Sequence, residues 1–200
     1  MSDRYPPGVP CWVECTDLGF YCELLGWTLQ GGVAQLDGRA LAGVGTRPEW
    51  LTYVRGDGDV AARVEQAGGS VLGESLFADP AGAAFGVEPE RGAEVVNAPG
   101  CWNWSNLQTP DPEAAAAFYA AVFGWETSDV FSDAVAWIVA ADGPARWDVT
   151  FNVEDADAIA HRAEELRGSI AVAPYDEGPT RIAALRDPNG APFTVSSFGG

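Results

Sequence analysis

The sequence contains little positive charge. Only 11 of its 200 residues are lysine or arginine, against 29 acidic ones, so the net charge is −18 and the isoelectric point lies near 4.1. The electric field of such a protein repels phosphate backbones and anionic lipids. We therefore expect neither a nucleic-acid partner nor a membrane partner.

The sequence also has few of the histidine and cysteine residues that bind metals and no long apolar runs. The chain has one histidine and four cysteines with no Cys-x-x-Cys pair, so we expect buried free thiols rather than a metal site or a disulfide framework. Residues 1–10 lack the apolar run of a secretion signal, and no stretch is long enough to span a membrane. These absences indicate a cytoplasmic protein.

What the sequence does contain is an internal repeat. Residues 12–27 (WVECTDLGFYCELLGW) return as residues 104–125 (WSNLQTPDPEAAAAFYAAVFGW), with the same Phe-Tyr and Gly-Trp ending. Segments that open at Trp50 and Trp147 correspond in the same way, and an Asp-Pro-x-Gly turn follows each of them. Three anchors in the same order indicate a duplication.

Each copy alternates helical and strand patterns. Asp111 is placed to cap a helix that has proline in its first turn and ends at Gly124. A second amphipathic pattern predicts a helix over residues 155–166, and apolar residues at 60, 64 and 67 mark its counterpart in the first copy. Short runs bounded by Gly, Pro and Asp predict strands over residues 134–140, 169–174 and 180–185.

This order of motifs resembles the vicinal oxygen chelate superfamily, which has the glyoxalase and bleomycin-resistance fold, in its two-domain hydroxylase-like branch. The motifs are Trp-x-x-Leu, Asp-Pro-Glu-Ala-Ala, Phe-Tyr, Gly-Trp, Trp-x-x-Phe and Asp-Pro-x-Gly-x-x-Phe, and they cover residues 10–198. The resemblance implies an α+β fold in which tandem βαβββ modules form two cup-shaped mixed sheets. We expect a first domain over residues 1–88, a linker over 89–100 and a second domain over 101–200.

The first copy is shorter than the second in two places. The segment 12–20 is six residues shorter than 104–118, and the segment 70–79 is nine residues shorter than 169–187. Nine residues is about the length of a strand with its turn. We expect a truncated helix and a missing strand in the first half, which makes the second half the better candidate for an intact cup.

Metal-binding members of the superfamily place His, Gln or Glu at fixed strand positions of each cup. Carried over to this sequence, these positions are Trp12, Leu51 and Gly86 in the first half and Trp104, Asp148 and Thr194 in the second. One carboxylate per cup at most holds a divalent ion poorly. We therefore expect no metal and no cofactor, with a shifted site at the nearby Glu14 and Glu88 as the alternative.

Strand alternation predicts which side chains line each cup. In the second half they are Trp104, Asn106, Asp148, Thr150, Thr194 and Ser196. In the first half they are Trp12, Glu14, Leu51, Tyr53, Gly86 and Glu88. An indole with a few polar groups suits a site that stacks a flat ligand and fixes its orientation.

Several single residues leave alternatives open. Trp12, Trp102 and Trp104 either plug a cup or line it. Asp148 inside a cup would have a raised pKa, which suits a catalytic acid or base; otherwise it is an exposed strand residue or accepts a backbone hydrogen bond. His161 lies among acidic residues on the polar face of its helix and is expected at the surface.

Two functions remain for the same pocket. The first is metal-independent binding of an aromatic or polycyclic small molecule, of natural-product or antibiotic type, for sequestration or resistance. The second is a metal-free cyclase or isomerase of natural-product biosynthesis that uses Asp148 as its acid or base. A metal-dependent lyase or dioxygenase is disfavoured by the ligand positions. The expected partner is a small organic ligand, and the chain is a monomer or a homodimer.

Overall fold

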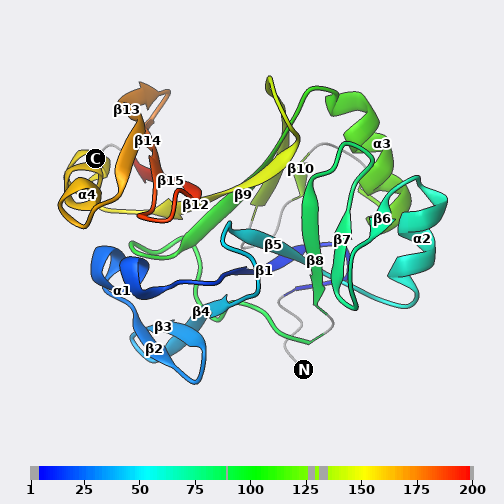
Figure 1. Cartoon of the computed structure of the whole chain (residues 1–200), viewed down its shortest axis with the longest axis horizontal. Helices are drawn as coiled ribbons and strands as arrows, with labels where there is room; N and C mark the ends of the chain where they lie inside the picture. Colours follow the sequence, from blue (N-terminus) through cyan, green and yellow to red (C-terminus); the bar gives the residue numbers. More distant parts are fainter. Residues whose placement is uncertain (1–4, 89, 126–128, 131–134, 199–200) are drawn as a thin grey trace. The chain divides into compact units, whose positions relative to one another are not determined.

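The structure is a computed structural model that describes residues 5–88, 90–125, 129–130 and 135–198. Within these ranges it contains four helices and fifteen strands (Figure 1). The ends of the expected domains (1–4 and 199–200), residue 89 of the expected linker and residue 134 of an expected strand lie outside the described residues.

Eight strands of the first half form one mixed sheet, in the order β2-β3-β4-β1-β5-β8-β7-β6. They are β1 (Pro10–Cys15), β2 (Thr28–Gln30), β3 (Val33–Leu36), β4 (Arg39–Val44), β5 (Leu51–Arg55), β6 (Ser70–Val71), β7 (Leu76–Ala78) and β8 (Ala84–Glu88). The pairs β1–β4 and β5–β8 are parallel, whereas the hairpins are antiparallel.

Seven strands of the second half form the other mixed sheet, in the order β10-β11-β9-β12-β15-β14-β13. They are β9 (Trp102–Thr109), β10 (Asp129–Val130), β11 (Val135–Ala140), β12 (Arg146–Asn152), β13 (Ser169–Glu177), β14 (Thr180–Arg186) and β15 (Pro192–Phe198). Strands β12 and β15 are parallel, and β13, β14 and β15 are antiparallel neighbours. The expected α+β fold with two mixed sheets is confirmed.

Three of the four described helices begin directly after a capping aspartate. The four helices are α1 (Gly19–Leu25), α2 (Val60–Gln66), α3 (Pro112–Phe123) and α4 (Ala156–Glu165). The Asp111 carboxylate accepts a hydrogen bond from the Ala114 amide, and Gly124 ends α3 with a left-handed φ of 76°. Asp155 caps α4 through the Ala158 amide in the same way. Figure 1 shows α4 beside β13 and β14.

The first half is shortened, but it keeps its strand. Helix α1 has 7 residues against 12 in α3, which confirms the truncated helix. The strand expected to be missing is instead reduced to the two residues of β6, whereas its counterpart β13 has nine. That expectation was wrong because two residues suffice for a ladder: Ser70 and Val71 pair with Ala78 and Phe77.

The two compact units of the chain do not coincide with its sequence halves. Unit 1 comprises Met1–Trp12, Leu51–Gly92 and Ser105–Asp148, and unit 2 comprises Val13–Trp50, Ala93–Trp104 and Val149–Gly200. Each unit therefore takes one helix from each half, α2 and α3 in unit 1 and α1 and α4 in unit 2. The sheets follow the repeat, whereas the hydrophobic cores combine residues of both halves.

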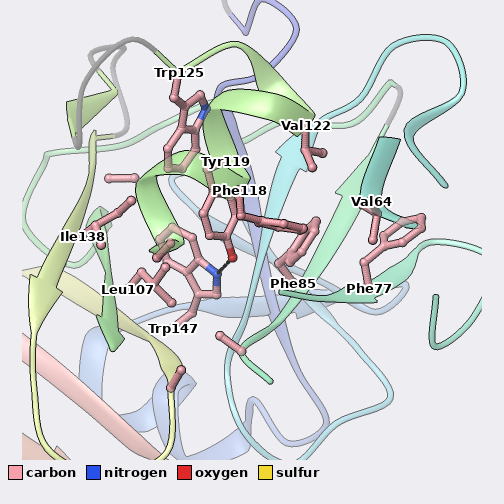
Figure 2. Packing of buried hydrophobic residues seen from close by; sticks show 14 of the residues in the cluster. Val64, Phe77, Phe85, Leu107, Phe118, Tyr119, Val122, Trp125, Ile138 and Trp147 are labelled. Atoms are coloured by element: carbon pink, nitrogen blue, oxygen red, sulfur yellow. Dashed lines mark hydrogen bonds between the residues drawn. The ribbon is translucent and has the colours of Figure 1, made fainter. Parts of the chain in front are cut away.

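The core of unit 1 surrounds Tyr119 of α3 (Figure 2). Its ring stacks on Trp125 at 4.9 Å between centroids, and its hydroxyl accepts a hydrogen bond of 3.1 Å from the Trp147 indole. The same hydroxyl donates to Asp79, at 3.5 Å, in the Asp-Pro-x-Gly turn of the first half. Amides of that turn also bind the Asp79 carboxylate, and burial raises its pKa.

Unit 2 repeats this arrangement with the halves exchanged. Tyr21 of α1 donates to Asp187 of the second-half turn, at 3.3 Å, and packs against Trp27, Trp50 and Phe193. Burial raises the pKa of Tyr21, and the nearby Asp187 carboxylate raises it further. The Trp50 indole N–H has no hydrogen-bond partner in the described residues. In each unit, the tyrosine of the Phe-Tyr motif in one half thus donates a hydrogen bond to the aspartate of the Asp-Pro-x-Gly motif in the other half.

Candidate functional site

Strand β9 presents two different sides. Leu107 packs in the core of unit 1, so the side chains that alternate with it lie on the opposite side of the strand. Trp104 and Asn106 are on that side and are half-buried, whereas Ser105 is fully buried. We call the side of each sheet opposite its helix-packed core the far face.

Strand β12 alternates in the same manner. Trp147 packs in the unit 1 core and Phe151 in the aromatic core of unit 2, so Asp148 and Thr150 lie on the far face. Asp148 is 6% exposed and Thr150 is fully buried. Asp148 is therefore not the exposed strand residue that was one alternative for it.

Predicted site residues from β12 and β15 are neighbours. Thr150 pairs in register with Thr194, and Asn152 pairs with Ser196. The Ser196 hydroxyl accepts a hydrogen bond of 3.3 Å from the Asn103 side-chain amide. Asn152 was missed by the sequence analysis, although the period of two that selected Thr150 extends to it.

The Thr150 hydroxyl is an unpaired polar group. It is fully buried and has no hydrogen-bond partner in the described residues, and neither has the side-chain carbonyl of Asn152. A buried polar atom without a partner costs about 1 to 3 kcal/mol. Such groups in a folded protein mark places where a ligand or a water molecule completes the hydrogen bonding.

A matched pair of substitutions tests this assignment. Thr52 is also fully buried, but its hydroxyl donates to the Ser105 hydroxyl at 2.9 Å. Thr52→Val is expected to lower the free energy of unfolding by about 2 kcal/mol, because it removes the buried hydrogen bond to the Ser105 hydroxyl. Thr150→Val is expected to leave it unchanged or to raise it by about 1 kcal/mol. Urea unfolding of both variants measures the difference, and equal destabilisation would contradict the assignment.

The far face of the first sheet is filled by the chain itself. Tyr53 and Gly86 are register partners on β5 and β8, and a methyl group added to Gly86 would overlap the Tyr53 ring. Trp12 is fully buried, and the guanidinium of Arg91 lies 5.7 Å from its ring centroid. Of the two roles left open for Trp12, its complete burial favours filling the cup over lining a ligand site.

The segment that follows β8 is held over this face by Arg55 and Glu88. Arg55 is 8% exposed and donates a hydrogen bond of 2.9 Å to the Arg91 carbonyl. Glu88 accepts hydrogen bonds from the amides of Glu90 and Arg91, so its carboxylate closes a turn. Gly92 packs so tightly against Tyr5 that an added Cβ would come within 2.6 Å of the ring. Arg55 was missed because nothing in the local pattern predicts where this segment docks.

Glu14 does not lie in the same unit as the other predicted first-half residues Trp12, Tyr53 and Glu88. Glu14, on β1, is half-buried beside Gly45 in unit 2, whereas the other three belong to unit 1. Trp102 is fully buried. The His161 side chain is 77% exposed and lies 3.7 Å from the Glu165 carboxylate, which confirms its surface position.

The superfamily implies a divalent metal, but the residues at its ligand positions do not fit one. In the first sheet these positions hold an indole, a leucine and a glycine under a tyrosine ring. In the second sheet they hold Trp104, Asp148 and Thr194, a single carboxylate with no imidazole. Within the described part of the chain, no group of three His, Cys, Asp or Glu residues is close enough to hold an ion. Divalent ions need several converging N or O ligands.

The cysteines are free thiols, as expected. Cys11, Cys15 and Cys101 are buried and Cys22 is half-buried. Burial raises the pKa of Cys11 and of Cys15 to about 12 and that of Cys101 to about 11. None of these three thiols is an activated nucleophile, because a reactive cysteine needs a lowered pKa. No helix in the described ranges is long and apolar enough to cross a bilayer.

Comparisons with known proteins agree with this fold. The model of a glyoxalase-like domain matches residues 104–196. The anthracycline biosynthesis protein DauV of Streptomyces sp. strain C5 is 33% identical over 258 aligned positions, covering 96% of this chain and 94% of that protein. The putative glyoxylase CFP32 of Mycobacterium bovis is 34% identical over 250 positions, covering 96% of this chain and 95% of that protein.

Solved structures of similar fold include a Mn(II)-bound glyoxalase and a dioxygenase. The Mn(II)-bound glyoxalase from Novosphingobium aromaticivorans has a TM-score of 0.62 and 16% identity, covering 97% of this chain and 81% of that one. The 2,3-dioxygenase LapB from Pseudomonas sp. KL28 has a TM-score of 0.58 and 14% identity, covering 98% and 94%. At such identities the likeness shows the fold alone. Together with the relatives, it shows that the chain belongs to the glyoxalase-like family of the vicinal oxygen chelate superfamily.

Proposed function

We propose that this protein binds an aromatic or polycyclic small molecule on the far face of its second sheet. The observation that carries the proposal is the contrast between the two sheets at equivalent positions. In the first sheet the register pair on this face is Tyr53 and Gly86, with the ring covering the glycine. In the second sheet the same pair is Thr150 and Thr194, two small hydroxyl residues.

The side chains around this pair supply what such a ligand needs. Trp104 keeps part of its indole exposed, whereas its counterpart Trp12 is fully buried. An indole face stacks a flat ring system, and a few polar groups fix its orientation. The unpaired hydroxyl of Thr150 is one such group.

The ligand class follows from the relatives. Two of them, DauV and DnrV, are named anthracycline biosynthesis proteins, and each aligns with 96% of this chain. We infer a natural-product ligand of polycyclic aromatic type, bound without a metal because the ligand positions lack the donors for one.

Calorimetric titration with an uncharged anthracycline aglycone tests the proposal. The aglycone is chosen because the net charge of −18 attracts any amino-sugar ammonium group without specific contacts. We expect saturable binding of one molecule per chain, unchanged by added EDTA. Affinity that depends on added zinc or manganese would contradict metal-independent binding.

The burial of Asp148 favours a second candidate function, a metal-free cyclase or isomerase. A carboxyl group that is 6% exposed on the far face is suited to hold or move a proton. Asp148→Asn is then expected to keep the affinity for the aglycone within about threefold while product formation is lost by at least about 100-fold. Liquid chromatography with NMR detects the product, because isomers share a mass. If the wild-type protein returns every polycyclic substrate unchanged, binding alone remains.

A further inference from the structure

A cavity lies between the end of α1 and the start of α4. Its volume is about 310 Å³, and it belongs entirely to unit 2. Leu24, Leu25, Val153 and Ile159 give it apolar walls, and Glu154 stands at its edge. Glu154 is exposed, and so is the neighbouring Asp155, which also lines the cavity.

In unit 1 an arginine joins the equivalent elements. Arg63 of α2 donates a hydrogen bond of 2.8 Å from Nε to the carbonyl of Val122, in the last turn of α3. Its Nη2 donates to the carbonyl and to the carboxylate of Asp57, both at 2.9 Å. The guanidinium thus binds one helix-end carbonyl and one carboxylate.

The repeat identifies the corresponding residues in unit 2. Arg63 and Ile159 both lie four residues after the capping aspartates, Asp59 and Asp155. Val122 and Leu24 both lie two residues before the glycine that ends the helix. Asp57 and Glu154 both lie two residues after the end of a strand, β5 or β12. Unit 2 therefore keeps a carboxylate and a helix-end carbonyl but has isoleucine where unit 1 has the cation.

We propose that this cavity binds a small organic cation with an apolar stem, such as an alkylguanidinium or a primary alkylamine. The cation would take the place that the Arg63 guanidinium has in unit 1, beside Glu154 and the last turn of α1. Carbonyls in the last turn of a helix have no partner within the helix and accept such donors. The stem would pack against Leu24, Leu25 and Ile159. This site is separate from the far face and does not depend on the function proposed for it.

The test is a titration of the ¹⁵N-labelled protein with n-butylguanidinium, followed by amide chemical shifts. N-butylurea has the same shape without the charge and serves as the control compound. We expect saturable shifts at residues 24–25 and 158–159, with the urea binding about fivefold more weakly. Equal binding of the two compounds would show an apolar pocket without cation recognition and would overturn the proposal, as would shifts that do not saturate.

Two variants and one control locate the site. Ile159→Arg places a guanidinium in the cavity from within and is expected to abolish butylguanidinium binding. Glu154→Gln is expected to weaken binding by up to about fivefold, because an exposed ion pair contributes no more than that. Glu164→Gln removes an equal charge from an exposed position of α4 outside the cavity and is expected to leave binding unchanged. Binding that survives Ile159→Arg, or that falls equally with both glutamine variants, would overturn the proposal.

Discussion

Replacing Trp104 with alanine is expected to weaken binding of the uncharged anthracycline aglycone by at least about 20-fold. The indole is half-buried on the far face of the second sheet, where the neighbouring strands carry small polar residues. A stacked aromatic residue at the centre of a binding site typically contributes about 2 kcal/mol or more to binding. Calorimetric titration of the variant measures the loss directly.

The control for this substitution removes another aromatic ring. Tyr175 lies on the edge strand β13 and is 44% exposed, so Tyr175→Ala is expected to leave the affinity unchanged. Circular dichroism of both variants checks that they are folded at the temperature of the titration. If Trp104→Ala binds the aglycone as the wild type does, the ligand does not stack on this indole and the proposed site is wrong.

Gly86→Thr is expected to destabilise the protein by about 3 kcal/mol. The added Cβ would overlap the ring of Tyr53, which is the register partner of Gly86 on β5. The backbone of a strand accepts threonine well, so the cost comes from the ring and not from the conformation of β8. Urea unfolding measures the change in the free energy of unfolding.

A double substitution isolates the cause. Tyr53→Thr together with Gly86→Thr gives the first sheet the register pair that Thr150 and Thr194 form in the second. The double variant is expected to be more stable than Gly86→Thr alone, with a coupling energy of about 2 kcal/mol between the two positions. If the changes in unfolding free energy are additive, the Tyr53 ring does not fill the space above Gly86. The contrast between the two sheets, which carries the proposed function, would then be wrong.

Local signals in the sequence predicted the elements well. Asp111 caps the helix expected of it, because a cap depends only on the three residues that follow it. Asp155, the first residue of the helix expected over 155–166, is its capping residue. The side of β12 on which Thr150 lies follows from a period of two along a single strand. The pairing of Thr150 with Thr194 is seen in the structure and was not predicted from the sequence.

Features that depend on distant segments were not predicted. The guanidinium of Arg91, which lies far along the chain, is 5.7 Å from the ring centroid of the buried Trp12, and Arg55 binds the Arg91 carbonyl. No periodicity in β1 or β5 reports where that later segment docks. The exchange between halves is of the same kind: Tyr119 binds Asp79 of the other copy, although each copy carries both motifs.

A crystal structure of the protein with the uncharged anthracycline aglycone tests most directly whether the ligand binds on the far face of the second sheet. It should show one ligand whose rings lie against Trp104 and whose polar edge reaches Thr150 and Thr194. Aglycone bound instead over Tyr53 on the first sheet, or a metal ion coordinated by Asp148 beneath the ligand, would contradict it.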